Sequence, residues 1–571
     1  MNVQTLPTDA SSILALTWND YEPYFSELEV RKLNEENIET WLNDWSRLAA
    51  TVDEHYWRLY IATTVNTADK ESEAQFNQYI EEIQPAAKTA EQKLKDKILA
   101  SGLSPKTFET GLRRIQAEAE IFREENLPLL AEEQKLVTDY NKLIGSLTVL
   151  WDGEERTFAQ MLALLYQTDR SIRQRSWESR EACLLEQRQN INELWEKFVT
   201  VRLKIAENAG MPDYRAYMWK QRFRFDYSPE DCKSFHAAIE QVVVPAARRV
   251  YERRRQRLGI DTVRPWDIYV DPLGTTPIKP YETIDEFKSK SRAIFQEVDL
   301  KFGEYFQMMM DEGLLDLESR KNKAPGAYSL GLHVAHRPFI FMNNIQTSLD
   351  VQTILHEGGH AFHEFERAHV NFYQRGEIYL PAEFAEVASM GMELIASPYK
   401  KKEYGGFYTE SEAARAMIEL LEDFITFWPY MALVDAFQHW IYENPRDGSK
   451  AANCEAKWAE LWDRFMSGID YSGLEDVKKT YWHRQPHLFD GPFYYIEYGL
   501  ALLGAVQVWA NSRQDQKKAV ADYRRALALG ATVPLPQLFA TAGAKFAFDA
   551  ATLKEAADLM EKVIGEMEAK L

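Results

Sequence analysis

Two histidines one helical turn apart are the residues of this chain best suited to chemistry. His356 and His360 enclose Glu357 in the segment TILHEGGHAFHEFE, residues 353–366. Residues four apart lie on one face of a helix, so both imidazoles can occupy positions around one tetrahedral zinc ion. Glu357 follows the first histidine and would lie beside the metal, where it can take a proton from the attacking water. The motif predicts zinc-dependent hydrolysis.

The same motif contains two consecutive glycines, Gly358 and Gly359. Glycine inside a helix costs about 1 kcal/mol relative to alanine, so a purely structural helix has little reason to carry a pair. A helix whose backbone is approached closely by another element or by a substrate does have a reason. We therefore expect a close approach at this point.

A catalytic zinc ion needs a third protein ligand and one open position. The next predicted helix is LPAEFAEVASMGMELIA, residues 380–396. Its Glu386 stands among small and apolar residues and should point inward, where a buried carboxylate needs a partner such as zinc. Glu383 and Glu393 suit helix ends or the surface. Ser389 is placed to form a hydrogen bond with the third ligand.

HEGGHAFHEFE and the later EFAEVASMGMEL, with 25 residues between His360 and Glu386, resemble the oligoendopeptidase F and thimet oligopeptidase family of zinc metallopeptidases. The resemblance extends over about residues 100–565, including the segment 151–180. It implies that His356, His360 and Glu386 bind one Zn²⁺ ion per chain. It also implies that Glu357 is the general base.

The segment PHLFDGPFYYIEYGLALLG, residues 486–504, resembles a family segment whose histidine and tyrosines line the cleft opposite zinc. The matching residues are His487, Tyr494 and Tyr498, with Tyr495 left open because the tyrosine register is uncertain by one or two positions. The resemblance implies that they bind the substrate carbonyl and the transition state. A phenol suits this task because it stays protonated at pH 7, whereas core packing is the alternative use of such aromatics.

Thermolysin-like enzymes place an acid four residues after the third ligand, but this chain has Met390 there. Glu393, on the same helix face as Glu386, is then the nearest candidate to orient a zinc histidine. His363 extends the motif either as a further ligand or as a buried, hydrogen-bonded histidine, and the second role is favoured because three protein ligands and water complete the site.

The remaining histidines divide into two groups. His333 and His336 lie near a predicted hairpin turn and are candidates for substrate contact. The rest are assigned structural or surface roles: His55, His236, His369, His439 and His483.

The elements that must position these residues are mostly helical. Glu, Lys, Gln, Leu and Ala dominate the first 200 residues, and apolar residues recur at spacings of three and four. Two short runs, 328–334 and 338–342, predict a small β-hairpin just before the zinc helix. We expect a mainly α protein with an N-terminal helical region (1–204) and a catalytic region (205–571). The family resemblance implies two helical halves around a deep substrate channel.

Composition limits the function classes. The chain has 571 residues and a net charge of 67 − 88 = −21, which argues against binding to nucleic acid or to anionic lipid. Six arginines between Arg248 and Arg257 are therefore interpreted as a solvated or acid-paired helix face. Three separated cysteines make no disulfide framework. With no secretory signal and no apolar segment long enough to span a membrane, the prediction is a cytoplasmic protein.

These observations predict a zinc endopeptidase that cleaves internal bonds of short, unfolded oligopeptides. The edge of the predicted hairpin is suited to binding an extended peptide through main-chain hydrogen bonds. A carboxypeptidase or dipeptidyl carboxypeptidase would instead require a cationic clamp such as Arg484 for the free carboxylate. Two further candidates are a catalytically silent peptide-binding protein and a helical scaffold with a chance motif. The sequence carries no signal for an oligomeric state.

Overall fold

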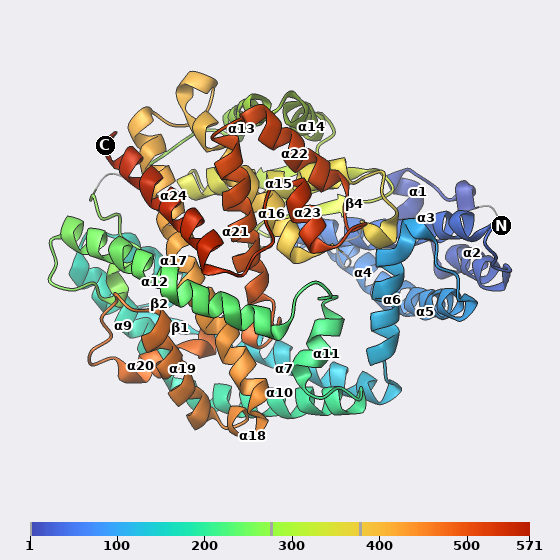
Figure 1. The fold of residues 1–571 in the computed structure, drawn as a ribbon, viewed down its shortest axis with the longest axis horizontal. Helices are drawn as coiled ribbons and strands as arrows, with labels where there is room; N and C mark the ends of the chain where they lie inside the picture. The colour runs from blue at the N-terminus through green and yellow to red at the C-terminus, as the bar shows by residue number, and fades with distance from the viewer. Residues whose placement is uncertain (1–2, 275–277, 376–379) are drawn as a thin grey trace.

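The computed structural model describes residues 3–274, 278–375 and 380–571. Helices dominate it, with two small sheets (Figure 1), so the expected mainly α architecture is confirmed. Figure 1 places α15 (Ser348–Glu366), the helix that carries His356 and His360, near the middle of the molecule, with other helices arranged around it. The fold therefore surrounds the motif with several layers of helices.

The N-terminal helices occupy one end of the longest axis of the molecule (Figure 1). They are α1 (Ala10–Leu14), α2 (Trp18–Val30), α3 (Ile38–Val65), α4 (Lys70–Gln78), α5 (Gln84–Ser101) and α6 (Glu109–Ile121). Trp41 and Trp45 of α3 are fully buried in a hydrophobic cluster built mainly from this region. The Trp41 indole N–H donates to the Leu28 carbonyl at 2.9 Å, which satisfies its one polar group.

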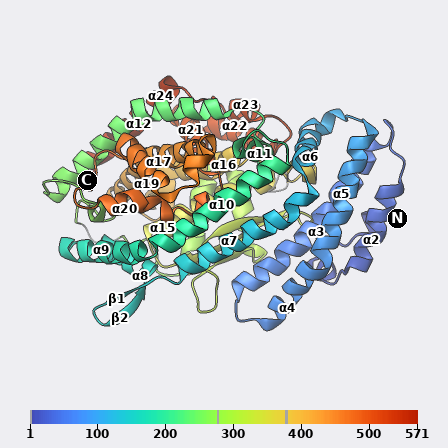
Figure 2. The same ribbon diagram turned by 90° about the horizontal axis from the view of Figure 1, so that it is seen from below.

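A second group of helices follows along the lower side of the molecule, where α7 and α10 lie side by side (Figure 2). It comprises α7 (Leu127–Gly145), α8 (Phe158–Ala163), α9 (Arg170–Glu186), α10 (Arg188–Asn208) and α11 (Tyr214–Gln221). The expected division between residues 204 and 205 remains a prediction. Helix α10 runs through this point without a break, and its Trp195 belongs to the large cluster of the catalytic region.

A hairpin that the sequence analysis did not predict projects between α7 and α8 (Figure 2). Strands β1 (Thr148–Trp151) and β2 (Glu154–Thr157) pair antiparallel around Asp152 and Gly153. Both turn residues have positive φ, at 51° and 87°. An Asp-Gly pair is the preferred sequence for such a two-residue turn, so this dipeptide was the missed signal.

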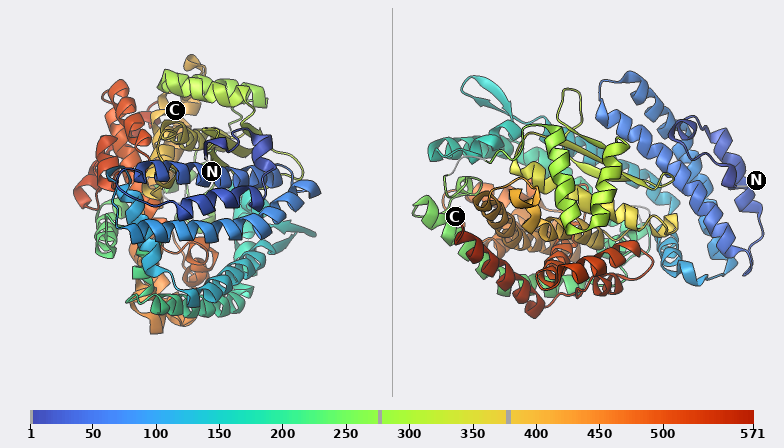
Figure 3. Two further views of the ribbon diagram at one scale, coloured as in Figure 1. Left: turned by 90° about the vertical axis from the view of Figure 1, so that its right-hand side faces the viewer. Right: turned by 90° about the horizontal axis from the view of Figure 1, so that it is seen from above.

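The remaining helices belong to the expected catalytic region and contribute to the largest hydrophobic cluster. They include α12 (Pro229–Leu258), α13 (Ile284–Val298), α14 (Leu300–Asp311), α17 (Glu410–Glu443), α18 (Pro445–Gly448), α19 (Ala451–Phe465), α20 (Glu475–Thr480), α22 (Gln516–Ala528), α23 (Leu535–Thr541) and α24 (Ala550–Glu568). The right-hand view of Figure 3 shows α24 lying along α12. Helix α17 packs on both of them, so these three helices form one packed group.

The expected hairpin before the zinc motif is present. Strands β4 (Tyr328–Leu332) and β5 (Arg337–Asn344) pair antiparallel, from Tyr328 opposite Phe341 to Leu332 opposite Arg337. Strand β3 (Leu315–Glu318), which was not predicted, pairs parallel to β5 on its other side. Parallel neighbours need a long connection, so short-range sequence patterns carry little information about them.

A buried charged cluster fixes this hairpin to the N-terminal helices. Glu54 of α3 accepts hydrogen bonds from the backbone N–H groups of Val334 and Ala335 at 2.5 and 2.9 Å. His333 lies between two carboxylates, Glu364 at 3.1 Å and Asp53 at 3.4 Å. The hairpin turn is therefore held by charge-assisted hydrogen bonds to helices distant in sequence.

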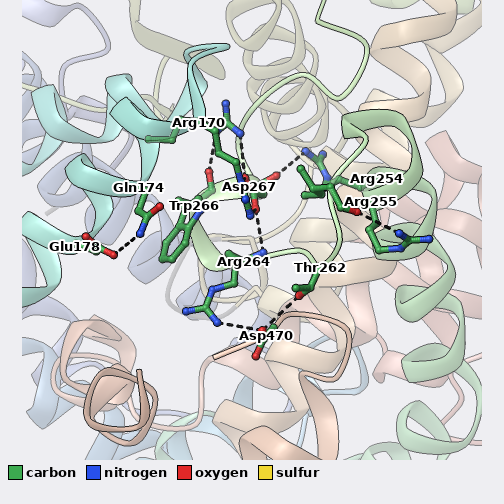
Figure 4. Close-up of polar contacts among 12 residues, drawn as sticks. Arg170, Gln174, Glu178, Arg254, Arg255, Thr262, Arg264, Trp266, Asp267 and Asp470 are labelled. Carbon is green, nitrogen blue, oxygen red and sulfur yellow. Dashed lines mark hydrogen bonds and ion pairs between the residues drawn. The ribbon is translucent and has the colours of Figure 1, made fainter. Parts of the chain in front are cut away.

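The arginine-rich stretch of α12 is paired with acids and carbonyls, as expected. Arg249 and Arg257 form ion pairs with α24 acids, Glu561 and Glu568. Arg254 donates to the Val270 carbonyl at 2.7 Å, next to a second arginine cluster around Asp267 (Figure 4). These contacts tie the end of α12 to its neighbours.

Asp267 is fully buried and joins α9 to the loop after α12 (Figure 4). Its carboxylate accepts from Arg170 at 2.8 Å and 3.0 Å, from Arg173 at 3.0 Å and from the Arg264 backbone N–H at 3.0 Å. Burial alone would raise the pKa of Asp267, but these hydrogen bonds outweigh burial and lower that pKa. The carboxylate is therefore ionised in the folded protein at neutral pH.

Asp267→Asn should lower the free energy of unfolding by about 2 kcal/mol at neutral pH, because the buried Arg173 loses a charged partner. The folded pKa of Asp267 is lowered, so its stabilisation is present above the ordinary Asp pKa and is lost as pH falls through the folded value. The difference between wild type and variant should therefore shrink in acid. Urea unfolding at neutral and acidic pH measures it.

Asp470→Asn is the matched control in the same region (Figure 4). Asp470 pairs with Arg264 at 3.1 Å, but its side chain is 33% exposed, so the pair is screened by water. We expect a change below about 1 kcal/mol. Equal losses in the two variants, or a difference that grows in acid, would contradict the assignment of Asp267.

Among the described residues, none of the helices is long and apolar enough to cross a lipid bilayer. The three cysteines, Cys183, Cys232 and Cys454, are all free, and the last two are buried. The expectation that they form no disulfide framework is confirmed.

Candidate metal centre and active site

Three packed helices position the motif. Helix α15 (Ser348–Glu366) carries both histidines, α16 (Ala382–Ile395) carries Glu386, and α21 (Tyr495–Ser512) follows the C-terminal tyrosine segment. Helix α16 packs against both α15 and α21. A capping box starts α15, in which Asp350 accepts from the Thr347 backbone N–H at 2.9 Å.

The paired glycines allow the close approach that the sequence predicted. A Cβ on Gly359 would lie 2.5 Å from the Ala388 carbonyl oxygen and 2.6 Å from the Ser389 Cα, both backbone atoms of α16. A Cβ on Gly358 would lie 2.5 Å from the Phe295 ring. The two helices can therefore touch backbone to backbone only because residue 359 has no side chain.

This contact brings the three expected ligands together. Nε2 of His356 lies 3.5 Å from Oε2 of Glu386, and Nε2 of His360 lies 3.7 Å from the same oxygen. One ligand atom from each residue lies within 4.8 Å of the other two. The imidazole side chains are 28% and 24% exposed, so one side of the group faces solvent.

Further residues hold two of these ligands in orientation. Nδ1 of His356 lies 2.7 Å from Oε1 of Glu393, which leaves Nε2 directed toward Glu386. Ser389 donates to Oε2 of Glu386 at 2.8 Å. Glu393 is buried rather than at the surface, and it takes the orienting position for which Met390 left a gap.

The electrostatics of the metal-free group are strongly coupled. Burial would lower the pKa of His356, but the hydrogen bond to Glu393 outweighs it and raises that pKa to about 9. Burial and the charges of His356 and Arg367 hold the pKa of His360 well below its usual range. Burial raises the pKa of Glu357 to about 7 against the opposing charge of His356. A divalent cation would offset the negative charge of this cluster.

The donor set fits zinc. Two imidazole nitrogens and one carboxylate oxygen are a known catalytic zinc set, and the solvent-facing side leaves room for a fourth ligand. The His356–Glu393 hydrogen bond supplies the support that metal-binding histidines usually have. These residues therefore match the chemistry that the motif predicted.

Glu393→Gln should weaken zinc binding by about 10- to 100-fold, because the His356 ring loses its carboxylate partner. Competition with a chromogenic chelator measures the affinity directly. Glu383→Gln is the matched control, since Glu383 lies buried on the same helix but accepts from Tyr227 at 2.7 Å. Equal affinities for wild type and Glu393→Gln would remove Glu393 from this role.

The C-terminal tyrosine segment leads into α21, which packs against α16, the helix that carries Glu386. The rings of His487, Tyr494 and Tyr498 cluster with centroids 5.1–6.1 Å apart. Burial and then the charge of Glu386 raise the pKa of Tyr494, and the same two causes raise that of Tyr498 to about 12. Both phenols therefore stay protonated at neutral pH, and the charge of Glu386 contributes to this in each case.

Tyr495 has different surroundings. Its ring packs against Phe427 and Tyr430 at centroid distances of 5.6 and 6.0 Å. Burial, Tyr498 and Tyr481 raise its pKa, with no contribution from Glu386. Tyr495 nevertheless belongs to the same aromatic group, since its ring lies 5.1 Å from that of His487 and 5.9 Å from that of Tyr498. The tyrosine register therefore stays a prediction.

A cavity of about 280 Å³ adjoins Tyr494. Its lining includes Arg113 of α6, Arg222 and Glu383, and Leu535 of α23. It therefore lies between the N-terminal helices and the catalytic region.

Sequence analysis missed two arginines that hold the tyrosine segment. Arg222 donates to the Pro492 carbonyl at 2.9 Å, and Arg224 donates to the Phe493 carbonyl and to Glu497. Both arginines come from the short segment QRFRF, residues 221–225. The alternation of arginine and phenylalanine was the one sequence feature that marked this segment. It gives no indication that Arg222 binds the Pro492 carbonyl, 270 residues along the chain.

The remaining candidates have structural surroundings. His363 is buried 6.1 Å from the Phe384 ring, as the favoured role required, but neither ring nitrogen has a hydrogen-bond partner among the described residues. His333 is held between carboxylates, and His336 lies 3.1 Å from Arg375. Arg484 is buried against Tyr481 and forms a bidentate ion pair with Glu181, so it is not free to clamp a carboxylate.

Known proteins resemble this chain over much of its length. A sequence profile of Peptidase family M3 matches residues 163–558. Oligopeptidase PepF of Bacillus subtilis is 24% identical over 349 residues, covering 57% of this chain and 48% of that protein. An oligoendopeptidase F homolog of Borreliella burgdorferi is 23% identical over 320 residues, covering 54% and 52%. The chain thus spans about half the length of these curated relatives.

Solved structures match nearly the whole fold. The structure described as PZ peptidase A with inhibitor 2 is 26% identical, with a TM-score of 0.84 and 98% of each chain covered. A putative oligoendopeptidase F structure is 25% identical, with a TM-score of 0.84 and 99% of each chain covered. The resemblance inferred from the motifs is confirmed, and the chain belongs to Peptidase family M3.

Proposed function

We propose that this protein is a zinc-dependent endopeptidase that hydrolyses internal bonds of short, unfolded oligopeptides. The observation that carries the proposal is the convergence of His356 Nε2 and His360 Nε2 on Oε2 of Glu386, with Glu357 one residue along the same helix. Oligopeptidase and oligoendopeptidase names among the relatives agree with this reaction class.

In this proposal His356, His360 and Glu386 hold one zinc ion. A bound zinc ion would polarise the scissile carbonyl and make water more acidic. The Glu357 carboxylate takes the proton of the attacking water and then passes it to the leaving amine nitrogen. Its buried position suits both steps, because burial raises its pKa above the usual range of a carboxyl group and so makes it a better proton acceptor.

Tyr494, Tyr498 and His487 would bind the substrate carbonyl and the developing oxyanion. Neutral donors aimed at this charge stabilise the transition state more than the ground state. Arg222 and Arg224 donate to the backbone carbonyls of Pro492 and Phe493, which directly precede Tyr494 and so restrict the position of its backbone. The proposed substrate channel lies between the N-terminal helices and the catalytic region, where the cavity beside Tyr494 supports it.

Arg484 lends no support to the carboxypeptidase alternative, because Glu181 already neutralises it. The deciding experiment uses peptides of about ten residues, blocked at both ends, that carry no stable fold. We expect internal cleavage, detected by mass spectrometry of the products. Cleavage restricted to peptides with a free C-terminal carboxylate would replace the proposal by a carboxypeptidase. No cleavage by the zinc-loaded protein would favour a peptide-binding role.

Tyr494→Phe and Tyr498→Phe should each lower kcat by about 10²-fold, because each removes a donor to the oxyanion. KM should change less, since a donor used mainly in the transition state contributes little to substrate binding. Tyr495→Phe is the matched control, because this neighbour packs on Phe427 and Tyr430. A larger loss in Tyr495→Phe than in the other two would reverse the assigned register.

A further inference from the structure

A second group of metal-ligating side chains lies buried between α12 and α17, outside the site described above. Cys232 and His236 are four residues apart on α12, and Asp435 and His439 are four residues apart on α17. Each pair therefore projects from one face of its helix. All four residues are at most 3% exposed.

The atoms of this group are close enough to share one ion. One ligand atom from each of Cys232, Asp435 and His439 lies within 4.8 Å of the other two. Nε2 of His236 lies 2.8 Å from Oδ2 of Asp435, and Nε2 of His439 lies 3.3 Å from the same oxygen. His236 thus supports the carboxylate in the way that histidine and carboxylate pair around metal sites.

Two polar atoms of the group have no hydrogen-bond partner among the residues that the structure describes. These are Oδ1 of Asp435 and Nδ1 of His439, which are both buried, whereas Nε2 of His439 has the 3.3 Å contact with Oδ2 of Asp435. Buried polar atoms are almost always paired, so such a group calls for an explanation. A cation among them would satisfy the free carboxylate oxygen and one imidazole nitrogen together.

Charge and ligand softness select the ion. Burial raises the pKa of the Cys232 thiol, so it carries no charge at neutral pH unless a metal ion displaces its proton. A metal-bound Cys232 thiolate and the Asp435 carboxylate would together carry two negative charges, which a divalent cation neutralises. Sulfur, nitrogen and oxygen donors together suit zinc, whereas magnesium and calcium prefer oxygen alone.

We propose that Cys232, Asp435 and His439 bind a second, structural zinc ion, with His236 holding the Asp435 carboxylate. The site joins the beginning of α12 to the second half of α17. It also lies beneath the active-site tyrosine segment, because His439 packs against Phe493 at a centroid distance of 5.4 Å. The neighbouring Gln438 accepts from the Phe493 backbone N–H at 2.6 Å. A bound ion would therefore restrict the motion of the backbone at Phe493, and with it the position of Tyr494.

The two proposed sites differ in ligand chemistry, which makes them separable. The catalytic group offers nitrogen and oxygen donors only, so cobalt bound there gives no thiolate-to-metal charge-transfer band. The full-length protein would be produced in medium with Co²⁺ in place of zinc, and metal per chain and near-ultraviolet absorption would be recorded. Wild type should hold two cobalt ions and show the band. The double variant H356A/H360A should hold one cobalt ion and keep the band.

Cys232→Ser should lose the band and one metal ion per chain. Cys454→Ser is the matched control, since Cys454 is equally buried but its Sγ lies 3.1 Å from the Gly448 carbonyl oxygen. This variant should keep the band and both metal ions. A folded H356A/H360A protein without metal, or a band that survives Cys232→Ser, would overturn the proposal. Such a result would leave Asp435 as the buried partner of two histidines and would not affect the proposed catalysis.

A chelator gives a second readout on unmodified protein, independent of how Cys232→Ser folds. The catalytic ligands are partly exposed, whereas the second group is enclosed. Dialysis of the native protein should remove one zinc ion quickly and leave the other until the chain is unfolded. Loss of all zinc from the folded protein at a single rate would contradict a buried site.

Discussion

Glu357→Gln should reduce peptide hydrolysis by about 10³-fold while zinc stays bound. The amide keeps the size of the side chain but cannot accept the proton of the attacking water, and positioned general bases are worth about 10² to 10⁴ in rate. The three proposed ligands are untouched, so metal content should remain at the wild-type value. Cleavage of a blocked peptide, with zinc measured on the same sample, checks both statements.

Glu366→Gln is a control on the same helix. Glu366 pairs with Arg524 at 2.7 Å, and its replacement removes the same charge without touching the metal group. It should keep most of the activity. If Glu357→Gln hydrolyses peptides as fast as wild type, another group takes the proton and the proposed mechanism is wrong.

Gly359→Ala should lower the free energy of unfolding by about 3 kcal/mol, at the upper end of the usual cost of overpacking. The added methyl group would meet the Ala388 carbonyl oxygen at 2.5 Å and the Ser389 Cα at 2.6 Å. Neither is the flexible end of a side chain, so α15 and α16 must move apart. Since both helices carry proposed ligands, activity should fall by about 10²-fold as well.

Gly565→Ala is the matched control for this substitution. Gly565 lies inside α24, and a Cβ there would meet no atom within 4 Å. The same change should therefore stabilise the protein by as much as about 1 kcal/mol through helix propensity. Thermal and urea unfolding of both variants measure the contrast. A destabilisation by Gly565→Ala equal to that by Gly359→Ala would show that the helix contact is not the cause.

The sequence by itself determined the local part of the candidate site. The spacing of His356 and His360 required only that residues 353–366 be helical, and apolar periodicity fixes that locally. The buried surroundings of Glu386 were likewise readable from its neighbours on the chain. Even the close helix contact was visible in Gly358 and Gly359, because glycine pairs in a helix need a reason.

Tertiary structure decided every feature that depends on contacts between distant segments. Because residue 390 is Met, the sequence offered Glu393 only as the nearest candidate to orient His356. The packing of α15 on α16 is what brings Oε1 of Glu393 to 2.7 Å from Nδ1 of His356. The contacts of Tyr495 with Phe427 and Tyr430 of α17 were likewise not readable from its neighbours on the chain. Arg484 looked available for substrate until the fold paired it with Glu181.

The same distinction applies to the buried group on α12 and α17. His236 and His439 carry no signal in sequence, because their pairs with Cys232 and Asp435 are each a common four-residue spacing. Their possible role becomes visible only when the two helices pack and leave Oδ1 of Asp435 and Nδ1 of His439 without hydrogen-bond partners among the described residues. Periodicity and spacing are properties of neighbours along the chain, so they predict helices, motifs and buried faces, whereas the pairing of side chains from distant segments is set by long-range packing that no local pattern encodes.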